Sequence, residues 1–210
     1  MRSQATIERP TDRLDELRAP RDRIRLVTIP ERRFVMIDGS GPPGGEVFEA
    51  RMPGLYGLAY PVRFALKRRG VEVKVGPLEG LWWMSDGVVD LDAIFGKDRG
   101  DRETWRWTLM IGLPDEATDA ERQEHLAAAR TKLDPALAPT LRVERFEDGP
   151  CAQTMHVGPY ADERPTIELL HAGIAEAGLR ARGRHHEIYL GDPRRSAPER
   201  FRTILRQPVD

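Results

Sequence analysis

The chain has 210 residues, and its 33 lysines and arginines nearly balance its 34 aspartates and glutamates, so its formal net charge is -1 at pH 7. A near-neutral chain lacks the basic footprint of a nucleic-acid-binding protein. Its single cysteine, Cys151, excludes an intramolecular disulfide and a CxxC redox or metal pair. No apolar stretch approaches the roughly 18 residues that span a bilayer. We therefore expect a cytoplasmic protein that binds neither nucleic acid nor membrane directly.

The chain is predicted to begin with an arm, followed by a strand and a helix. Residues 8–25 are rich in arginine, aspartate and proline, which is typical of an exposed arm or of a short helix lying on a domain. We place the arm at 1–25 and one domain at 26–210. Residues 33–45 predict a strand that runs into a glycine and proline turn. The next helix carries its apolar stripe from Leu55 to Leu66 and ends near Gly70, with a break expected at Pro61.

Two further strands are predicted to follow this helix, at 71–75 and 105–111, while residues 76–83 continue the sheet or bend it. Thr118 and Glu121 have the spacing of a capping box, which starts a helix over about 118–133. This helix is expected to link two halves of the domain.

The second half is predicted to repeat the order of the first. A strand over 152–157 leads to Gly158-Pro159-Tyr160, and the helix that follows has its apolar stripe from Ile167 to Ile174 and ends near Gly178. Strands are expected at 184–190 and 203–206, with a short helical turn between Ser196 and Glu199. The sequence thus predicts an α+β protein with a strand-helix-strand-strand unit used twice, over about 26–115 and 140–210.

The strand at 185–190 holds the strongest candidate for chemistry. Side chains alternate along a strand, so His185, Glu187 and Tyr189 share one face, and His186, Ile188 and Leu190 share the other. A carboxylate two positions from a tyrosine suits a cavity that holds a flat or cationic molecule and activates water. The alternative is a surface strand on which Glu187 pairs with an arginine.

Aromatic residues and one histidine are candidates for ligand binding. They are Tyr56, Tyr60, Trp83, Trp105, Trp107, His156 and Tyr160. Each of the tryptophans is equally suited to an ordinary core, and His156 to a structural hydrogen bond. Trp82 and Trp83 are adjacent, so at most one of them faces the cavity. His185 and Glu187 lack a third metal ligand nearby, and neither a P-loop nor a GxGxxG motif is present, so no metal and no cofactor is expected.

Short motifs in both halves match one known family. They are Gly57–Tyr60, Gly76–Trp83, Trp105–Ile111, His156–Tyr160, His185–Leu190 and Leu205–Pro208. With these motifs the chain resembles the GyrI-like small-molecule-binding family, in its stand-alone bacterial branch. The resemblance implies duplicated βαββ modules of the SHS2 type, with two antiparallel sheets around a central aromatic cavity and pseudo-twofold symmetry.

The resemblance also implies a function. Members of the family serve as effector-binding halves of transcription activators or as free-standing proteins, and some of the latter hydrolyse cyclopropane-bearing DNA-alkylating compounds. For this chain that implies binding of a hydrophobic, planar molecule and its hydrolysis, with Glu187 as general base and Tyr189 orienting the polar end of the ligand. Two alternatives stay open: a non-catalytic protein that sequesters or senses hydrophobic or cationic drugs, and an inhibitor of a topoisomerase-like partner. The oligomeric state is not predicted.

Overall fold

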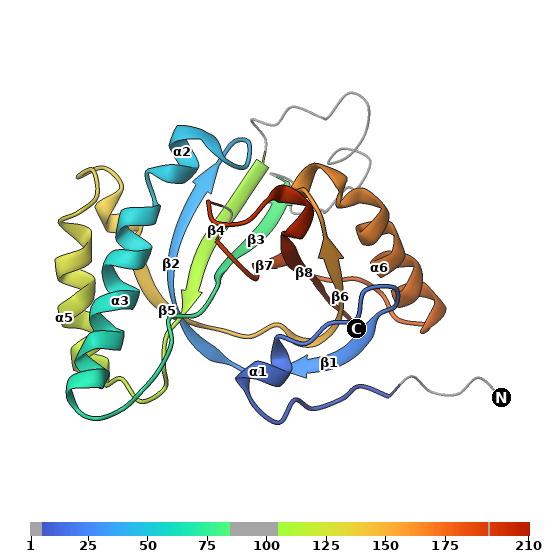
Figure 1. The fold of residues 1–210 in the computed structure, drawn as a ribbon, viewed down its shortest axis with the longest axis horizontal. Coiled ribbons are helices and arrows are strands. Elements are labelled where there is room, and N and C mark those ends of the chain that lie inside the picture. The colour runs from blue at the N-terminus through green and yellow to red at the C-terminus, as the bar shows by residue number, and fades with distance from the viewer. Residues whose placement is uncertain (1–5, 85–104, 193) are drawn as a thin grey trace. The chain divides into compact units, whose positions relative to one another are not determined.

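The computed structural model describes residues 6–84, 105–192 and 194–210. The chain divides into two compact units. The C-terminal unit draws its described residues from Met1–Glu31, Leu81–Asp98 and Glu147–Asp210, and the central unit from Arg32–Gly80 and Arg99–Phe146. Each unit is described by itself below, and Figure 1 labels the elements of both.

In the central unit, antiparallel strands are covered by two helices that lie side by side in Figure 1, α3 and α5. Strand β2 lies between β4 and β5, and Val35 is the register partner of both Ile111 and Val143. The elements are β2 (Arg32–Ser40), α2 (Gly45–Glu49), α3 (Met52–Arg68), β3 (Leu78–Met84), β4 (Trp105–Gly112), α5 (Asp119–Arg130), η2 (Ala138–Thr140) and β5 (Arg142–Phe146). The last four residues of β3 belong to the C-terminal unit.

In the C-terminal unit, helix α6 packs on β6 and β8, and the strands follow the order β1-β6-β8-β7-β3. The apolar core between α6 and the strands includes Ile167, Leu170 and Leu205, all nearly or fully buried. The elements are α1 (Arg13–Glu16), β1 (Arg25–Ile29), β6 (Gly149–Val157), η3 (Tyr160–Asp162), α6 (Arg164–Glu176), β7 (His185–Tyr189), η4 (Pro198–Arg200) and β8 (Arg202–Pro208).

The α+β class is confirmed, and the strand-helix-strand-strand order occurs twice, as β2-α3-β3-β4 and as β6-α6-β7-β8. In each case the first and last strands pair antiparallel, β2 with β4 and β6 with β8. An origin by duplication, the two separate sheets and the pseudo-twofold cavity stay predictions. Strands β1 and β5, at the outer edges of these pairings, were not among the predicted strands.

The break expected at Pro61 was wrong, because α3 runs without interruption for 17 residues. A proline inside a helix costs about 3 kcal/mol through the lost hydrogen bond and the clash of its ring. Against this, Leu55, Leu58, Val62 and Leu66 are fully buried, and each such side chain contributes roughly 1.5–3 kcal/mol. The burial of one apolar face therefore outweighs the cost of one proline.

The strand expected over 71–75 was also wrong, since these residues form no strand and lie half-buried or exposed. The Val73 carbonyl accepts a hydrogen bond from the Arg63 guanidinium at 3.1 Å instead of joining a ladder. The strand begins only at Leu78, after Gly76 and Pro77, where the proline offers no N–H to a neighbouring strand.

Other local signals are confirmed. Thr118 and Glu121 form a capping box at the start of α5, in which the Glu121 N–H donates to Thr118 Oγ1 at 3.2 Å and the Thr118 N–H donates to a Glu121 carboxylate oxygen at 2.8 Å. Gly70 and Gly178, with φ of 81° and 76°, lie directly beyond α3 and α6 in the left-handed conformation that glycine adopts most readily. Cys151 is fully buried, and its Sγ donates to the Gly149 carbonyl.

The arm is not simply exposed. The Glu8 N–H donates to the Leu26 carbonyl, and the side chain of Glu16 is 1% exposed. Residues 1–5 of the predicted arm lie outside the described residues.

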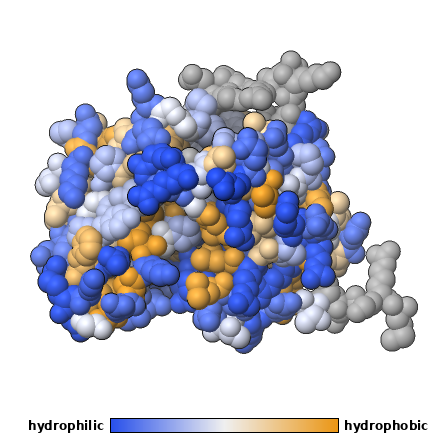
Figure 2. Space-filling view, viewed as in Figure 1, coloured by the Kyte–Doolittle hydropathy of each residue, from blue (hydrophilic) through white to orange (hydrophobic). Residues whose placement is uncertain are grey.

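In the described part of the chain, no helix is long and apolar enough to cross a bilayer. Figure 2 shows a face on which hydrophilic side chains predominate, with hydrophobic ones in small patches between them.

Candidate functional site

Strand β7 presents its side chains alternately, as predicted. The Tyr189 hydroxyl donates to Glu187 Oε2 at 2.7 Å, and His185 Nε2 lies 3.8 Å from Glu187 Oε1. On the opposite face, His186 Nδ1 lies 2.8 Å from Asp148 Oδ2. The side chains of His185, Glu187 and Tyr189 therefore face one way, and His186 faces the other.

Glu187 is a largely buried acid without a cationic partner. Its side chain is 15% exposed, and no arginine or lysine among the described residues forms an ion pair with it. Burial raises its pKa to about 7, while the hydrogen bond from Tyr189 and the charge of His186 act in the opposite direction. Burial also lowers the pKa of His185 to about 3, so that imidazole is neutral at pH 7. Glu187 is thus held near half-ionisation at neutral pH, which is the range of an effective general base.

Two aromatic residues of the C-terminal unit contact Tyr189. Trp82 Nε1 donates to the Tyr189 hydroxyl at 3.2 Å, and the Tyr160 ring meets the Tyr189 ring edge-on, with 5.6 Å between centroids. Burial, followed by the charges of Glu163 and Glu187, raises the pKa of Tyr160 to about 12. Both phenols therefore stay protonated at neutral pH and can donate hydrogen bonds.

A second buried acid, Glu163, belongs to the same site and was missed by the sequence analysis. Its residue is 4% exposed, and burial together with the charge of Glu187 raises its pKa well above the usual range, an effect that the Thr203 hydroxyl only partly offsets. The available signal was Arg164-Pro165: proline favours the first turn of a helix, so Glu163 occupies the N-cap position of α6. We call Trp82, Tyr160, Glu163, Glu187 and Tyr189 the acid–aromatic cluster.

A small cavity borders the acid–aromatic cluster. It has a volume of about 20 Å³ and is lined in part by Tyr160, Tyr189 and Phe201. A water needs roughly 10–15 Å³ of such space, whereas a drug-sized ligand needs about 300 Å³ or more. The cavity can therefore hold one water but not a whole ligand, and it touches the acid–aromatic cluster through Tyr160 and Tyr189.

The other predicted residues of the C-terminal unit are engaged elsewhere. The Arg184 guanidinium lies over the Trp83 ring, 3.8 Å from its centroid, so Trp82 and not Trp83 contacts Tyr189. Both ring nitrogens of His156 have partners, Thr166 Oγ1 at 3.0 Å and the Pro159 carbonyl at 3.1 Å. These bonds fix the turn that leads to Tyr160. Ligand binding by Trp83 and His156 stays a prediction.

Four predicted residues lie in the central unit. Tyr56 and Tyr60 stack along α3 with 6.0 Å between ring centroids, and Tyr60 is 45% exposed. Trp105 is half-buried at the start of β4. Trp107 is fully buried and donates from Nε1 to the Gly41 carbonyl at 3.2 Å, which is typical of a core residue. That these residues and the acid–aromatic cluster line one cavity stays a prediction.

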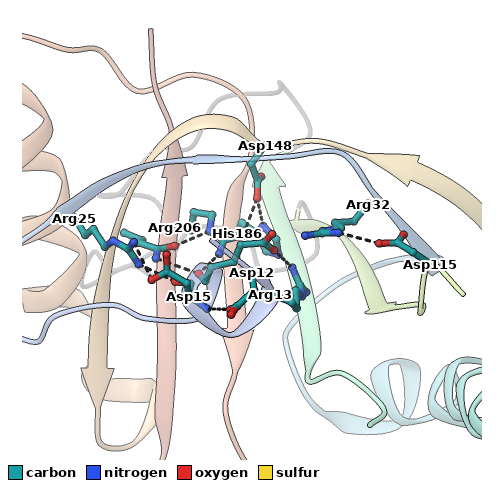
Figure 3. A network of polar contacts seen from close by, with 11 residues as sticks. Asp12, Arg13, Asp15, Arg25, Arg32, Asp115, Asp148, His186 and Arg206 are labelled. Carbon is teal, nitrogen blue, oxygen red and sulfur yellow. Dashed lines mark hydrogen bonds and ion pairs between the residues drawn. The ribbon is translucent and has the colours of Figure 1, made fainter. Parts of the chain in front are cut away.

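Behind β7, a buried polar network attaches the N-terminal arm to the strands (Figure 3). Asp148 Oδ2 accepts from Arg206 Nη1 at 3.0 Å as well as contacting His186. Arg206 Nη2 donates to the Glu16 carbonyl at 3.1 Å, and Gln153 Nε2 donates to the Arg18 carbonyl at 2.7 Å. We call the side chains of Asp148, Gln153, His186 and Arg206, with the arm carbonyls that they hold, the arm clamp.

A much larger groove, of about 1190 Å³, is open to solvent between the arm and α6. Among its charged side chains, Arg25 pairs with Glu8 and Asp15. None of the predicted site residues lines it. Across residues 6–84, 105–192 and 194–210, no three histidine, cysteine or carboxylate side chains gather closely enough to hold a metal ion.

Comparisons with known proteins agree with this description. A model of the GyrI-like small molecule binding domain matches residues 110–210. A conserved but uncharacterized protein of Listeria innocua is 36% identical, with 93% of this chain and 96% of that chain covered and a TM-score of 0.77.

A hydrolase from Listeria innocua is 33% identical, with 94% of this chain and 96% of that chain covered and a TM-score of 0.74. The C-terminal domain of EcmrR, at 11% identity, shares the fold, with 90% of this chain and 97% of that domain covered and a TM-score of 0.54. No curated protein matches the chain.

Proposed function

Because this chain belongs to the GyrI-like small-molecule binding domain family, we propose that it binds a hydrophobic, planar electrophile at the acid–aromatic cluster and hydrolyses it. The proposed substrates carry a cyclopropane conjugated to a dienone, as in strained DNA-alkylating compounds. Glu187 removes a proton from the attacking water, and Tyr189 orients the polar end of the substrate. The similarity to a Listeria innocua hydrolase supports a hydrolytic role.

One observation carries this proposal: a largely buried carboxyl with a pKa of about 7 whose hydrogen-bond partner, Tyr189, lines a space for one water. Burial holds the Glu187 pKa near neutrality, so the carboxylate is available and basic enough to accept a proton. The hydrogen bond from Tyr189, at 2.7 Å, fixes the orientation of the carboxylate. A purely structural acid in this position would be expected to have a cationic partner, because an unpaired buried charge is costly.

A non-catalytic binder is the second candidate. The acid–aromatic cluster combines aromatic rings with an acid, and such a surface also attracts hydrophobic cations without any reaction. In that case the protein sequesters or senses its ligand, and the perturbed pKa of Glu187 reflects only its burial.

The substitution Glu187→Gln separates the two candidates. Glutamine keeps the shape and hydrogen bonding of glutamate but cannot accept a proton from water. With a spirocyclopropyl cyclohexadienone as substrate, we expect the variant to bind it while turnover falls by roughly a hundredfold or more, as for loss of a general base. Product formation is followed by chromatography of the ring-opened hydroxyethyl phenol, and binding by tryptophan fluorescence.

The matched control is Glu199→Gln, which changes an exposed glutamate in η4 and is expected to keep wild-type turnover. Equal turnover by the wild type and by Glu187→Gln would remove Glu187 from the mechanism. Binding by the wild type without product above the uncatalysed reaction would assign the protein to sequestration or sensing.

A further inference from the structure

The structure contains a second acid whose position the proposed hydrolysis does not yet use. Resting on that proposed function, we propose that Glu163 is a catalytic general acid, which protonates the substrate oxygen as the strained ring opens. Glu187 acts as the base on water in the same turnover.

The first argument is the position of Glu163. As the N-cap residue of α6, it accepts backbone hydrogen bonds through its carbonyl from the N–H groups of Thr166, at 2.9 Å, and Ile167, at 3.0 Å. Its carboxyl makes no hydrogen bond to the first turn of the helix, although capping is the usual role of an acid at this position. The backbone is thus held rigidly, and the carboxyl is free for another task.

The second argument is burial without full pairing. Glu163 is 4% exposed, and its Oε1 atom has no hydrogen-bond partner within the residues that the structure describes. Leaving a buried polar atom unpaired costs roughly 1–3 kcal/mol. A helix N-cap could be occupied by serine or aspartate at lower cost, so this glutamate has no evident structural purpose.

The third argument is that both acids belong to one cluster. Tyr160, three residues before Glu163, packs against Tyr189, and Tyr189 donates to Glu187. The charges of both acids raise the pKa of both phenols, so the four groups lie near one another. Both of these tyrosines line the small cavity.

The electrostatics give the two acids different roles. Glu187 has a pKa of about 7, so a large fraction of it is ionised at neutral pH. Burial and then the charge of Glu187 raise the pKa of Glu163 well above its usual range, which favours its protonated form. Two neighbouring carboxyls in different protonation states form an acid and base pair.

The reaction balances with these two groups and one water. The water oxygen bonds to a cyclopropane methylene carbon, and the bond from that carbon to the dienone ring breaks. The electron pair of this bond moves through the ring to the carbonyl oxygen, which takes the proton of Glu163 and becomes a phenol. Glu187 takes the proton released by water. Transfer of that proton from Glu187 to Glu163 then restores the starting state, and the net change is addition of one water.

The activity test uses Glu163→Gln, which keeps a hydrogen-bond donor but has no transferable proton. We expect kcat on the spirocyclopropyl cyclohexadienone to fall by roughly a hundredfold, with a much smaller change in KM. The wild type is expected to have a bell-shaped pH profile, and the variant to lose its alkaline limb, which a merely structural role would not remove. Glu163→Asp, which keeps the acid, should recover part of kcat.

The control for this test is Glu168→Gln, at an exposed position on the same helix, which should retain wild-type kinetics. A substrate-free measurement follows the protonation of Glu163 by carbon-13 NMR of labelled glutamate carboxyls. At pH 7, Glu163 should be protonated in the wild type. Its pKa should be lower in Glu187→Gln, because the neighbouring charge is absent.

The outcomes separate the two proposals. A wild-type protein that forms no product overturns the proposed function itself, and with it a catalytic role for Glu163. Wild-type turnover combined with an unchanged kcat and pH profile in Glu163→Gln overturns the role of Glu163 alone. An ionised Glu163 at pH 7 in the titration also overturns that role, whatever the activity.

Discussion

At the scale of the residue, the burial of Glu187 makes the stability of the fold depend on its protonation. The ordinary pKa of a glutamate is 4.5, and burial raises that of Glu187 to about 7. The folded state therefore binds the proton more tightly than the unfolded state does. The favourable contribution is complete below the ordinary pKa of 4.5, and it is lost as the pH rises through the folded-state pKa near 7.

This gives a stability prediction that needs no substrate. Glu187→Gln cannot ionise, so relative to the wild type it should gain roughly 1–3 kcal/mol in free energy of unfolding between pH 5 and pH 8. Urea denaturation at the two pH values measures the difference. Glu199→Gln, an exposed control, should show no such gain. The raised pKa would be contradicted if the difference in free energy of unfolding between the variant and the wild type were the same at pH 8 as at pH 5.

At the scale of the element, β7 connects two polar systems on its two faces. His186, held by Asp148 and the arm clamp, precedes Glu187 of the acid–aromatic cluster. Burial would raise the pKa of Asp148, but the charges and hydrogen bonds of His186 and Arg206 lower it below its usual range. The stability that Asp148 contributes is therefore present above about pH 4 and is lost as the pH falls.

Removing the charge at the centre of the arm clamp should loosen the arm. Asp148→Asn leaves Arg206, whose side chain is 1% exposed, as a buried charge without its counter-ion. We expect a loss of roughly 3–5 kcal/mol in free energy of unfolding at pH 7, together with faster hydrogen exchange over residues 8–25. Asp22→Asn, at an exposed position, serves as the control. Exchange in the arm at the wild-type rate would show that the arm clamp does not hold it.

In the central unit, the pairing of β2 with β4 depends on the absence of a side chain at Gly39. Gly39 is the register partner of Trp107, and a Cβ atom at that position would overlap the six-membered ring of Trp107. Gly39→Ala should therefore destabilise the protein by roughly 1–3 kcal/mol, as overpacking does. In a Trp107→Leu background the same substitution should cost clearly less, which thermal denaturation of the four proteins in the cycle can measure.

At the scale of the whole molecule, the chain uses the strand-helix-strand-strand order twice but not in identical form. In the first case the helix contains Pro61 and is preceded by the short α2, whereas in the second η3 leads directly into α6. The acid–aromatic cluster takes its acids and phenols from the second case, on η3, on β7 and in the residue before α6. The repeated order thus serves as a scaffold, and the chemistry proposed here belongs to one copy.

The elements that the sequence predicted well are those in which one short-range rule dominates. Alternation along β7 placed His185, Glu187 and Tyr189 on one face, and the capping box set the start of α5. The errors occurred where distant contacts outweighed local preference. Helix α3 continues through Pro61 because one of its faces is buried. Residues 71–75 form no strand despite a suitable composition.

The sequence alone determined the α+β class, the repeated order of elements and the placement of Glu187 and Tyr189 on one face of a strand, because periodicity and spacing are properties of neighbouring residues. Only the tertiary structure decided that Glu163 shares a site with Glu187, that Trp82 and not Trp83 contacts Tyr189, and that the arm is clamped to buried side chains. These relations join residues far apart in the chain, as Trp82 and Tyr189 are. The pKa values of the two acids and the contacts of these residues arise from burial. Burial depends on how the strands and helices pack and not on any local pattern.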